Sequence, residues 1–130
     1  MKTVEDIILS SDQRGISLLR KYLQKDFCTK AALTVLDNPG TAVIATGFYI
    51  RSAGYIETDG PPGAIAIGRA LNKLDYKVVY VTDQYGMAAL ETIVGPNSRV
   101  YEFPILDFQA SKTLASNICN ELDPSIVIAV

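Results

Sequence analysis

The sequence predicts an α/β fold: a three-layer domain with a mainly parallel sheet of about four strands, preceded by N-terminal helices. From residue 41 onward, short continuous apolar runs alternate with amphipathic runs, and breakers rich in Gly, Pro, Asn and Asp separate several of them. Short apolar runs are typical of strands buried on both faces. Their alternation with helices implies a parallel sheet with right-handed crossovers.

The first third of the chain is predicted to be helical. Thr3 can cap a first helix whose first turn holds Glu5 and Asp6. Further helices are expected from about residue 16 to 23 and from about residue 29 to 36. The strong breaker at residues 37–40 ends the last of them.

The first strand is expected at residues 41–48, followed by a loop from about residue 49 to 60. Loops between strands and helices usually take about 2–6 residues, so this longer loop indicates a functional segment. The next helix is expected at residues 64–74, with an apolar stripe formed by Ala64, Ile67, Leu71 and Leu74.

The remaining strands are predicted at residues 77–82, 99–103 and 125–130, the second nearer an edge and the last buried. Helices at residues 87–94 and from Asp107 to about residue 122 separate them. The inner face of the last helix is expected to hold Phe108, Ser111, Ala115, Ile118 and Leu122, with Cys119 beside it.

The chain stops inside an apolar strand, where an open α/β sheet would continue into a ligand-binding loop. We therefore expect residues 1–130 to form a single α/β domain that is the N-terminal part of a longer domain. The alternative is a small complete domain whose last strand closes the sheet.

Composition narrows the classes of function. The chain has 130 residues, 48% hydrophobic and 20% charged, with a net charge of −2. Such a chain can build a core, and its charge argues against nucleic acid or anionic membrane as a partner. There is neither a signal peptide nor a run near the roughly 20 apolar residues of a membrane span, so a cytoplasmic location is expected.

The two cysteines and the missing histidines restrict the chemistry of any site. Cys28 and Cys119 are interpreted as free, buried thiols rather than a disulfide. Without histidine, a Ser-His-Asp triad and imidazole metal sites are excluded. A bound metal would be held by oxygen, which favours magnesium, manganese or calcium.

Residues 57–63, with the sequence ETDGPPG, form the candidate site. Pro61 and Pro62 stiffen the helix entry and lack N–H groups, so free donors are expected at Gly63, Ala64 and Ile65, with Gly60 just before. These donors and the helix dipole favour a carboxylate or phosphate.

Glu57 and Asp59 can face a common cation if the loop curls. The alternative is that Asp59 caps the helix and Glu57 is solvated. No GxGxxG motif or Walker A lysine is present, which weakens a nucleotide interpretation. Tyr49, Tyr55 and Tyr85 are either pocket-lining or surface residues.

The string ETDGPPGA at residues 57–64, followed by a helix and by VYVTD at residues 79–83, resembles the D-glutamate cyclase family. The ATGF at residues 45–48 is similar to that family's strand ending in Thr-Gly-Phe, and Arg14-Gly15-Ile16 resembles its N-terminal Arg-Gly-Ile segment. The resemblance spans about residues 14–130.

The resemblance implies a lyase that converts D-glutamate to 5-oxo-D-proline and water with a divalent metal, manganese or magnesium. It implies catalytic and metal-binding roles for Glu57 and Asp59. The substrate-binding residues it implies are Thr46, Gly47, Thr58, Gly60, Gly63, Ala64 and Asp83. Because the family's domains are longer, it also implies an incomplete site and a missing C-terminal half.

Two other functions stay open at this stage. One is a non-catalytic module that binds a small anion or a nucleotide phosphate at the same helix start. The other is a structural half-domain that completes its sheet with a partner chain, and a homo-oligomer is compatible with either.

Overall fold

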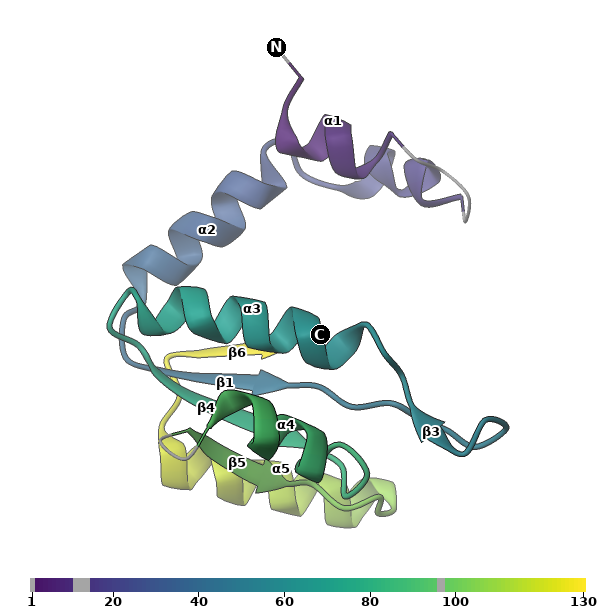
Figure 1. The fold of residues 1–130 in the computed structure, drawn as a ribbon. Coiled ribbons are helices and arrows are strands. Elements are labelled where there is room, and N and C mark those ends of the chain that lie inside the picture. The colour runs from purple at the N-terminus through teal and green to yellow at the C-terminus, as the bar shows by residue number, and fades with distance from the viewer. Residues whose placement is uncertain (1, 11–14, 96–97) are drawn as a thin grey trace. The chain divides into compact units, whose positions relative to one another are not determined.

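The computed structural model describes residues 2–10, 15–95 and 98–130 (Figure 1). The chain divides into two compact units, Met1–Asn38 and Pro39–Val130. The expected Arg14 of the Arg-Gly-Ile segment lies outside the described residues.

The first unit contains α1 (Val4–Ile8), the 3-10 helix η1 (Ile16–Tyr22) and α2 (Phe27–Asp37). The predicted cap of the first helix is confirmed. The Asp6 N–H donates to Thr3 Oγ1 and the Thr3 N–H donates to Asp6 Oδ2, both at 3.1 Å. This reciprocal pair is a capping box, which satisfies two N–H groups that the helix itself cannot.

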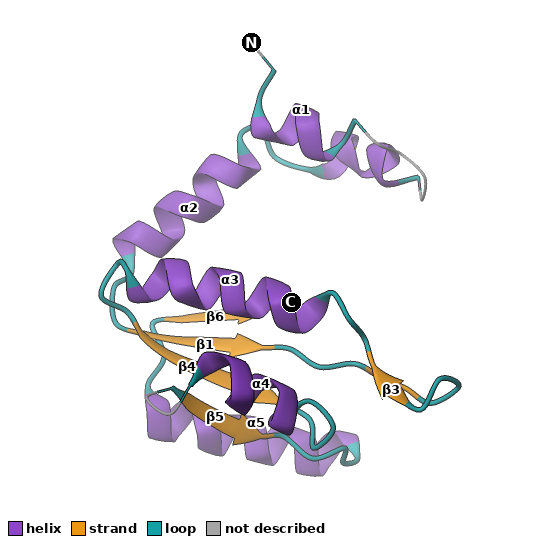
Figure 2. Cartoon of the chain, viewed as in Figure 1, coloured by secondary structure: helices purple, strands orange, loops and turns teal. Residues whose placement is uncertain are grey.

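The second unit is built on a four-stranded parallel sheet, which confirms the predicted fold class (Figure 2). The strand order is β5-β4-β1-β6. The strands are β1 (Thr41–Ala45), β4 (Lys77–Thr82), β5 (Arg99–Glu102) and β6 (Ile126–Ala129). Each lies within a run that the sequence predicts to be a strand.

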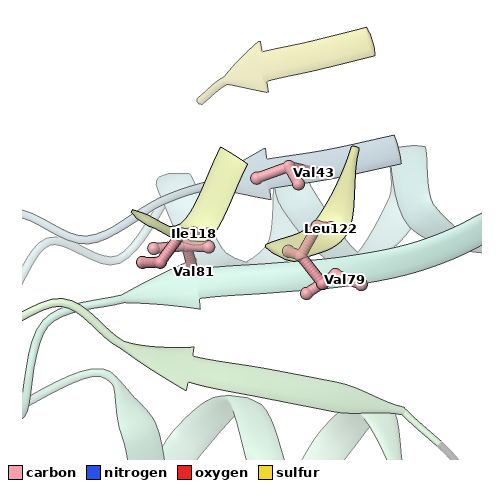
Figure 3. Packing of buried hydrophobic residues seen from close by; sticks show 5 residues of the cluster. All are labelled: Val43, Val79, Val81, Ile118 and Leu122. Atoms are coloured by element: carbon pink, nitrogen blue, oxygen red, sulfur yellow. The ribbon is translucent and has the colours of Figure 1, made fainter. Parts of the chain in front are cut away.

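The helices α3 (Gly60–Asn72), α4 (Met87–Val94) and α5 (Phe108–Leu122) connect successive strands. On one face of the sheet Val43, Val79 and Val81 pack against Ile118 and Leu122 of α5, as Figure 3 shows. On the other face Tyr80 packs so closely on α3 that a Cβ at Gly68 would lie 2.0 Å from its hydroxyl. Helices therefore cover both faces, and the three layers are as expected.

Helix α3 begins at Gly60 rather than at residue 64. Pro61 and Pro62 occupy its first turn, where a missing N–H costs nothing and a fixed φ is already helical. The helix ends at Asn72, so Leu74 lies beyond it and is 47% exposed. The prediction that Leu74 continues the buried stripe is wrong.

Three expectations for the end of the chain are also wrong. Phe108, placed on the inner face of α5, is 82% exposed because it is the first residue of that helix. Among the described strands β6 pairs with β1 alone, so it is an edge strand and its Val127 is 60% exposed. Cys119 is a free thiol, as expected, but it is exposed, and the free thiol Cys28 is likewise only half-buried.

The segment expected to be a long loop after β1 contains a small antiparallel hairpin. Its strands are β2 (Tyr49–Ile50) and β3 (Tyr55–Ile56), which pair as Tyr49 with Ile56 and Ile50 with Tyr55. The hairpin carries the chain out from the end of β1 and returns it to residues 57–59, just before α3.

Candidate functional site

The carboxyl ends of β1 and β4 form the base of the candidate site. Ala45 and Val81 are partners in the parallel register, and the Thr46 N–H donates to the Val81 carbonyl oxygen at 2.9 Å. The chain runs from β1 to β4 and β5, and then α5 returns it to β6 on the other side of β1. Open α/β sheets bind ligands outside the strand ends where the order reverses, which here is between β1 and β6.

Gly47 lies where any side chain would be strained. Its φ is 129°, and a Cβ there would lie 2.8 Å from Thr82 Oγ1 and 3.1 Å from Asp83 Oδ2. A side chain at this position would meet both the backbone restriction on L-residues and these polar atoms. Gly47 therefore brings the chain leaving β1 close against the end of β4.

Glu57 and Asp59 line the same hollow, together with Gly47, Gly60 and Val130. This acidic hollow has a volume of about 250 Å³. Both acidic residues are exposed. The Glu57 N–H donates to the Phe48 carbonyl oxygen at 2.8 Å, which holds the return of the hairpin beside the end of β1.

Asp59 stands at the N-cap position of α3, but its side chain accepts no capping hydrogen bond from that helix. The interpretation that Asp59 serves only as a helix cap is therefore not supported. Its carboxylate stays available at the acidic hollow.

The expectation of free N–H donors at Gly63, Ala64 and Ile65 is wrong. The Gly63 N–H donates to the Asp59 carbonyl oxygen at 3.2 Å. Ala64 and Ile65 are buried in the second turn, where helical hydrogen bonding uses the backbone N–H groups. Since prolines have no N–H, Gly60 is the only residue of the first three helical positions that carries one.

Two buried hydroxyls lie at the strand ends. Thr46 Oγ1 and Thr82 Oγ1 have no hydrogen-bond partner among the described residues, and the two residues are 7% and 2% exposed. A buried polar group without a partner costs about 1–3 kcal/mol, and a bound ligand, a water or a catalytic role is the usual explanation for one. Thr82 was not among the predicted site residues; it is the last residue of β4, directly before Asp83.

The loop after β4 is held to the hairpin. Asp83 Oδ1 accepts hydrogen bonds from the N–H groups of Tyr85 and Gly86, each at 2.9 Å. The rings of Tyr85 and Tyr49 stack with centroids 3.8 Å apart and planes 14° apart. These two tyrosines therefore pack on each other, whereas Tyr55 at the hairpin is 77% exposed.

A larger hollow of about 670 Å³ opens between the strand ends and α5. Thr46, Gly47, Thr82 and Asp83 border it, and most of its other lining is apolar. Gly47, Phe48 and Val130 border both hollows, so the two are neighbours. The sequence did not predict this hollow, because it depends on how α5 packs.

The predicted site residues are distributed between the two hollows. Glu57, Asp59, Gly47 and Gly60 line the acidic hollow, while Thr46, Gly47 and Asp83 line the larger one. Thr58, Gly63 and Ala64 are not among the residues that line either. The catalytic and binding roles of all nine residues stay predictions.

The residues at the acidic hollow fit a divalent metal that keeps open coordination positions. In the part of the chain that the structure describes, no group of three or more Cys, Asp or Glu residues is placed to hold a metal ion. Two carboxylates are nevertheless the donor set of many magnesium sites, in which water and substrate oxygens complete the shell. Glu57 and Asp59 are the two carboxylates at this hollow, and their role as metal ligands stays a prediction.

A comparison with known protein families shows to which family this chain belongs. The family model described as "D-glutamate cyclase-like, C-terminal" matches residues 4–128. The chain belongs to the D-glutamate cyclase-like family. This confirms the resemblance seen in the sequence. The expectation that this cyclase-like chain is the N-terminal part of a longer domain stays a prediction.

A human relative supports the same assignment. The cyclase-like chain is 31% identical over 133 residues to the mitochondrial D-glutamate cyclase of Homo sapiens. The alignment covers 95% of this chain and 21% of the human protein, so the chain spans about a fifth of that relative's length. Among the described residues, no helix is long and apolar enough to cross a membrane.

Proposed function

We propose that this chain provides acidic site residues of a D-glutamate cyclase-type lyase, which converts D-glutamate to 5-oxo-D-proline and water. The observation that carries the proposal is the shared position of Glu57 and Asp59 at one hollow beside the end of β1. Family membership supports the substrate and the reaction type that we propose. The divalent metal, manganese or magnesium, is part of the proposal.

The reaction joins the α-nitrogen of D-glutamate to its γ-carbon and breaks one γ-carbon–oxygen bond. The ammonium nitrogen gives up two protons, and the departing oxygen leaves as water. The nitrogen must lose a proton before it attacks, so the site needs a base. With no histidine in the chain, Glu57 and Asp59 are the candidates for that base.

Glu57 and Asp59 are also the residues that would hold the metal. A divalent metal, when bound, neutralises the γ-carboxylate and acts as a Lewis acid. Gly47 and Gly60 shape the wall of the acidic hollow, and their missing side chains let a ligand approach the backbone.

The test is product formation. The protein incubated with D-glutamate and manganese should yield 5-oxo-D-proline, and a chelator should abolish the yield. L-Glutamate is the stereochemical control. Absence of product with and without manganese or magnesium would remove this activity from the chain.

A second candidate function is non-catalytic binding of a small anion or a nucleotide phosphate. It is favoured by the unpartnered hydroxyls of Thr46 and Thr82, which could hold an anion without a metal. Thermal-shift measurements separate the two functions. Stabilisation by nucleotides, but not by D-glutamate with manganese, would favour the binding module.

The cytoplasmic location expected from the sequence stays a proposal, because the human relative is named as mitochondrial. Fractionation of cells that express the protein at its natural level would test it. Recovery in the organelle fraction would contradict the cytoplasmic assignment.

A further inference from the structure

The hydroxyls of Thr46 and Thr82 belong to one place in the fold. Ala45 and Val81 are register partners on neighbouring parallel strands. Thr46 follows Ala45 and Thr82 follows Val81 in the sequence. Both Oγ1 atoms are buried, and neither has a hydrogen-bond partner among the described residues. Folding therefore buries two adjacent donors and leaves both unused, which lowers stability unless a ligand compensates.

Glycines surround these two oxygens. A Cβ at Gly60 would lie 2.9 Å from Thr46 Oγ1, and a Cβ at Gly86 would lie 2.2 Å from Thr82 Oγ1. Gly47 would approach Thr82 Oγ1 to 2.8 Å in the same way. No side chain on any of the three could coexist with the present hydroxyl positions. Glycine at these positions therefore lets the backbone lie close to both oxygens.

Two helices begin beside the hydroxyls. Gly60 is the first residue of α3, which has 13 residues, and Gly86 is the N-cap of α4, which has eight. The positive ends of both helix dipoles thus lie next to Thr46 and Thr82. Hydroxyl donors together with helix N-termini suit a negatively charged group.

Neither lysine nor arginine is among the described residues that line the two hollows, and the charged side chains that do line them are the acids Asp83, Glu57 and Asp59. An anion that enters here must be recognised by hydroxyl and backbone groups. Both threonines border the larger hollow of about 670 Å³, but their Oγ1 atoms are themselves covered, so a ligand must displace neighbouring atoms to reach them.

We propose that Thr46 and Thr82 form a subsite for one carboxylate group of the ligand. The inference rests on the proposed function, in which the ligand is D-glutamate. The acidic hollow, reached past Gly47, then lies on the side of the positively charged amine or the metal. This arrangement orients an amino acid, with a carboxylate at the threonines and its reacting groups at Glu57 and Asp59.

Valine is close to threonine in shape and lacks the hydroxyl. Thr46→Val and Thr82→Val therefore separate the hydroxyl's effect on stability from its contribution to ligand binding. Without ligand, each variant should unfold at a higher temperature than the wild type, because an unpartnered buried hydroxyl is removed. Affinity for D-glutamate, and for glutarate as a dicarboxylate without an amine, should fall by roughly tenfold or more. Thr46→Ser and Thr82→Ser should retain most of the affinity.

Thr113→Val is the matched control. The Thr113 hydroxyl donates to the Gln109 carbonyl oxygen at 3.0 Å on the exposed side of α5. Its loss should leave both affinities unchanged. The full chain is used throughout, with affinities taken from ligand-dependent thermal shifts, with and without manganese.

The subsite is contradicted if Thr46→Val and Thr82→Val bind both dicarboxylates as the wild type does, or if neither dicarboxylate stabilises the wild type. Stabilisation by inorganic phosphate alone would overturn the carboxylate class. If dicarboxylates bind through the threonines but no 5-oxo-D-proline forms, the subsite stands and the proposed reaction fails.

Discussion

At the scale of single residues, the site depends on a glycine that only the folded chain explains. Gly47→Ala should destabilise the protein, because the new Cβ would meet Thr82 Oγ1 and Asp83 at a φ of 129°. We expect a loss of about 1–3 kcal/mol in the free energy of unfolding, measured by urea denaturation.

Gly54→Ala is the control for the backbone contribution. Gly54 also has a positive φ, 72°, but a Cβ added to it would have no described atom within 4 Å. Its substitution should cost only the left-handed strain of about 1–2 kcal/mol and should leave ligand binding intact. If both substitutions had equal effects on ligand binding, the contacts of a Cβ at Gly47 with Thr82 and Asp83 would be irrelevant to the site.

The sequence identified the acidic residues but not the hydroxyl pair. Glu57 and Asp59 stand out because two carboxylates, glycines and prolines within seven residues suit neither a strand nor a helix interior. Thr82 does not stand out, because a β-branched residue at a strand end is ordinary. Its importance comes from burial without a partner, a property that arises only when β1, β4 and the start of α4 come together.

At the scale of elements, the hairpin β2–β3 carries Glu57 and needs an anchor. The stacked rings of Tyr49 and Tyr85 tie it to the loop that follows β4. Such a ring pair contributes about 0.5–1.5 kcal/mol, so Tyr85→Ala should make the hairpin open more often by a factor of roughly 2–13.

Hydrogen exchange measures this opening at one atom, the Glu57 N–H, which donates to the Phe48 carbonyl oxygen. Its exchange should accelerate in Tyr85→Ala and stay near the wild-type rate in Tyr85→Phe, which keeps the ring. Tyr55→Ala is the control, because Tyr55 is 77% exposed. An unchanged rate in Tyr85→Ala would show that the stack does not anchor the hairpin.

A second link between elements should depend on pH. Glu121 of α5 accepts hydrogen bonds from the Tyr101 hydroxyl and the Arg99 guanidinium of β5, both at 2.5 Å. These bonds, that of Tyr101 first, lower the pKa of Glu121 below its usual 4.5. A lowered pKa in the folded state stabilises the protein above the unfolded pKa, and this stabilisation disappears as pH falls through the folded value.

Glu121→Gln should therefore unfold more easily than the wild type at neutral pH, and the difference should shrink as the pH is lowered through and below 4.5. Thermal unfolding from about pH 7 to about pH 3 is the measurement. Because the side chain is exposed, the effect should also weaken with added salt. A difference that is constant across this range would contradict the assigned cause.

At the scale of the whole molecule, the parallel sheet was predictable and its surroundings were not. Strands β1, β4 and β6 lie in mainly apolar runs and β5 alternates, and these patterns mark them whatever packs on them. The hairpin escaped prediction because strands of two residues show no periodicity. Phe108 and Val127 were misplaced because exposure at a helix start or a sheet edge depends on the neighbouring elements.

The edge of that sheet brings the acidic residues of the candidate site together. The loop that leaves β1 and the start of α3 bring Glu57 and Asp59 to one hollow, so they should act as one catalytic unit. Groups that act together in one step have non-additive effects when they are removed. Single replacements by neutral amides should then each cost about 10²–10⁴-fold in rate, the usual contribution of an acid or base.

The most direct test is the rate of 5-oxo-D-proline formation from D-glutamate with manganese, measured for the wild type, Glu57→Gln, Asp59→Asn and the double variant. The account predicts product with the wild type, a large loss in each single variant, and little further loss in the double variant. Absence of product with the wild type, or full activity in both single variants, would contradict it.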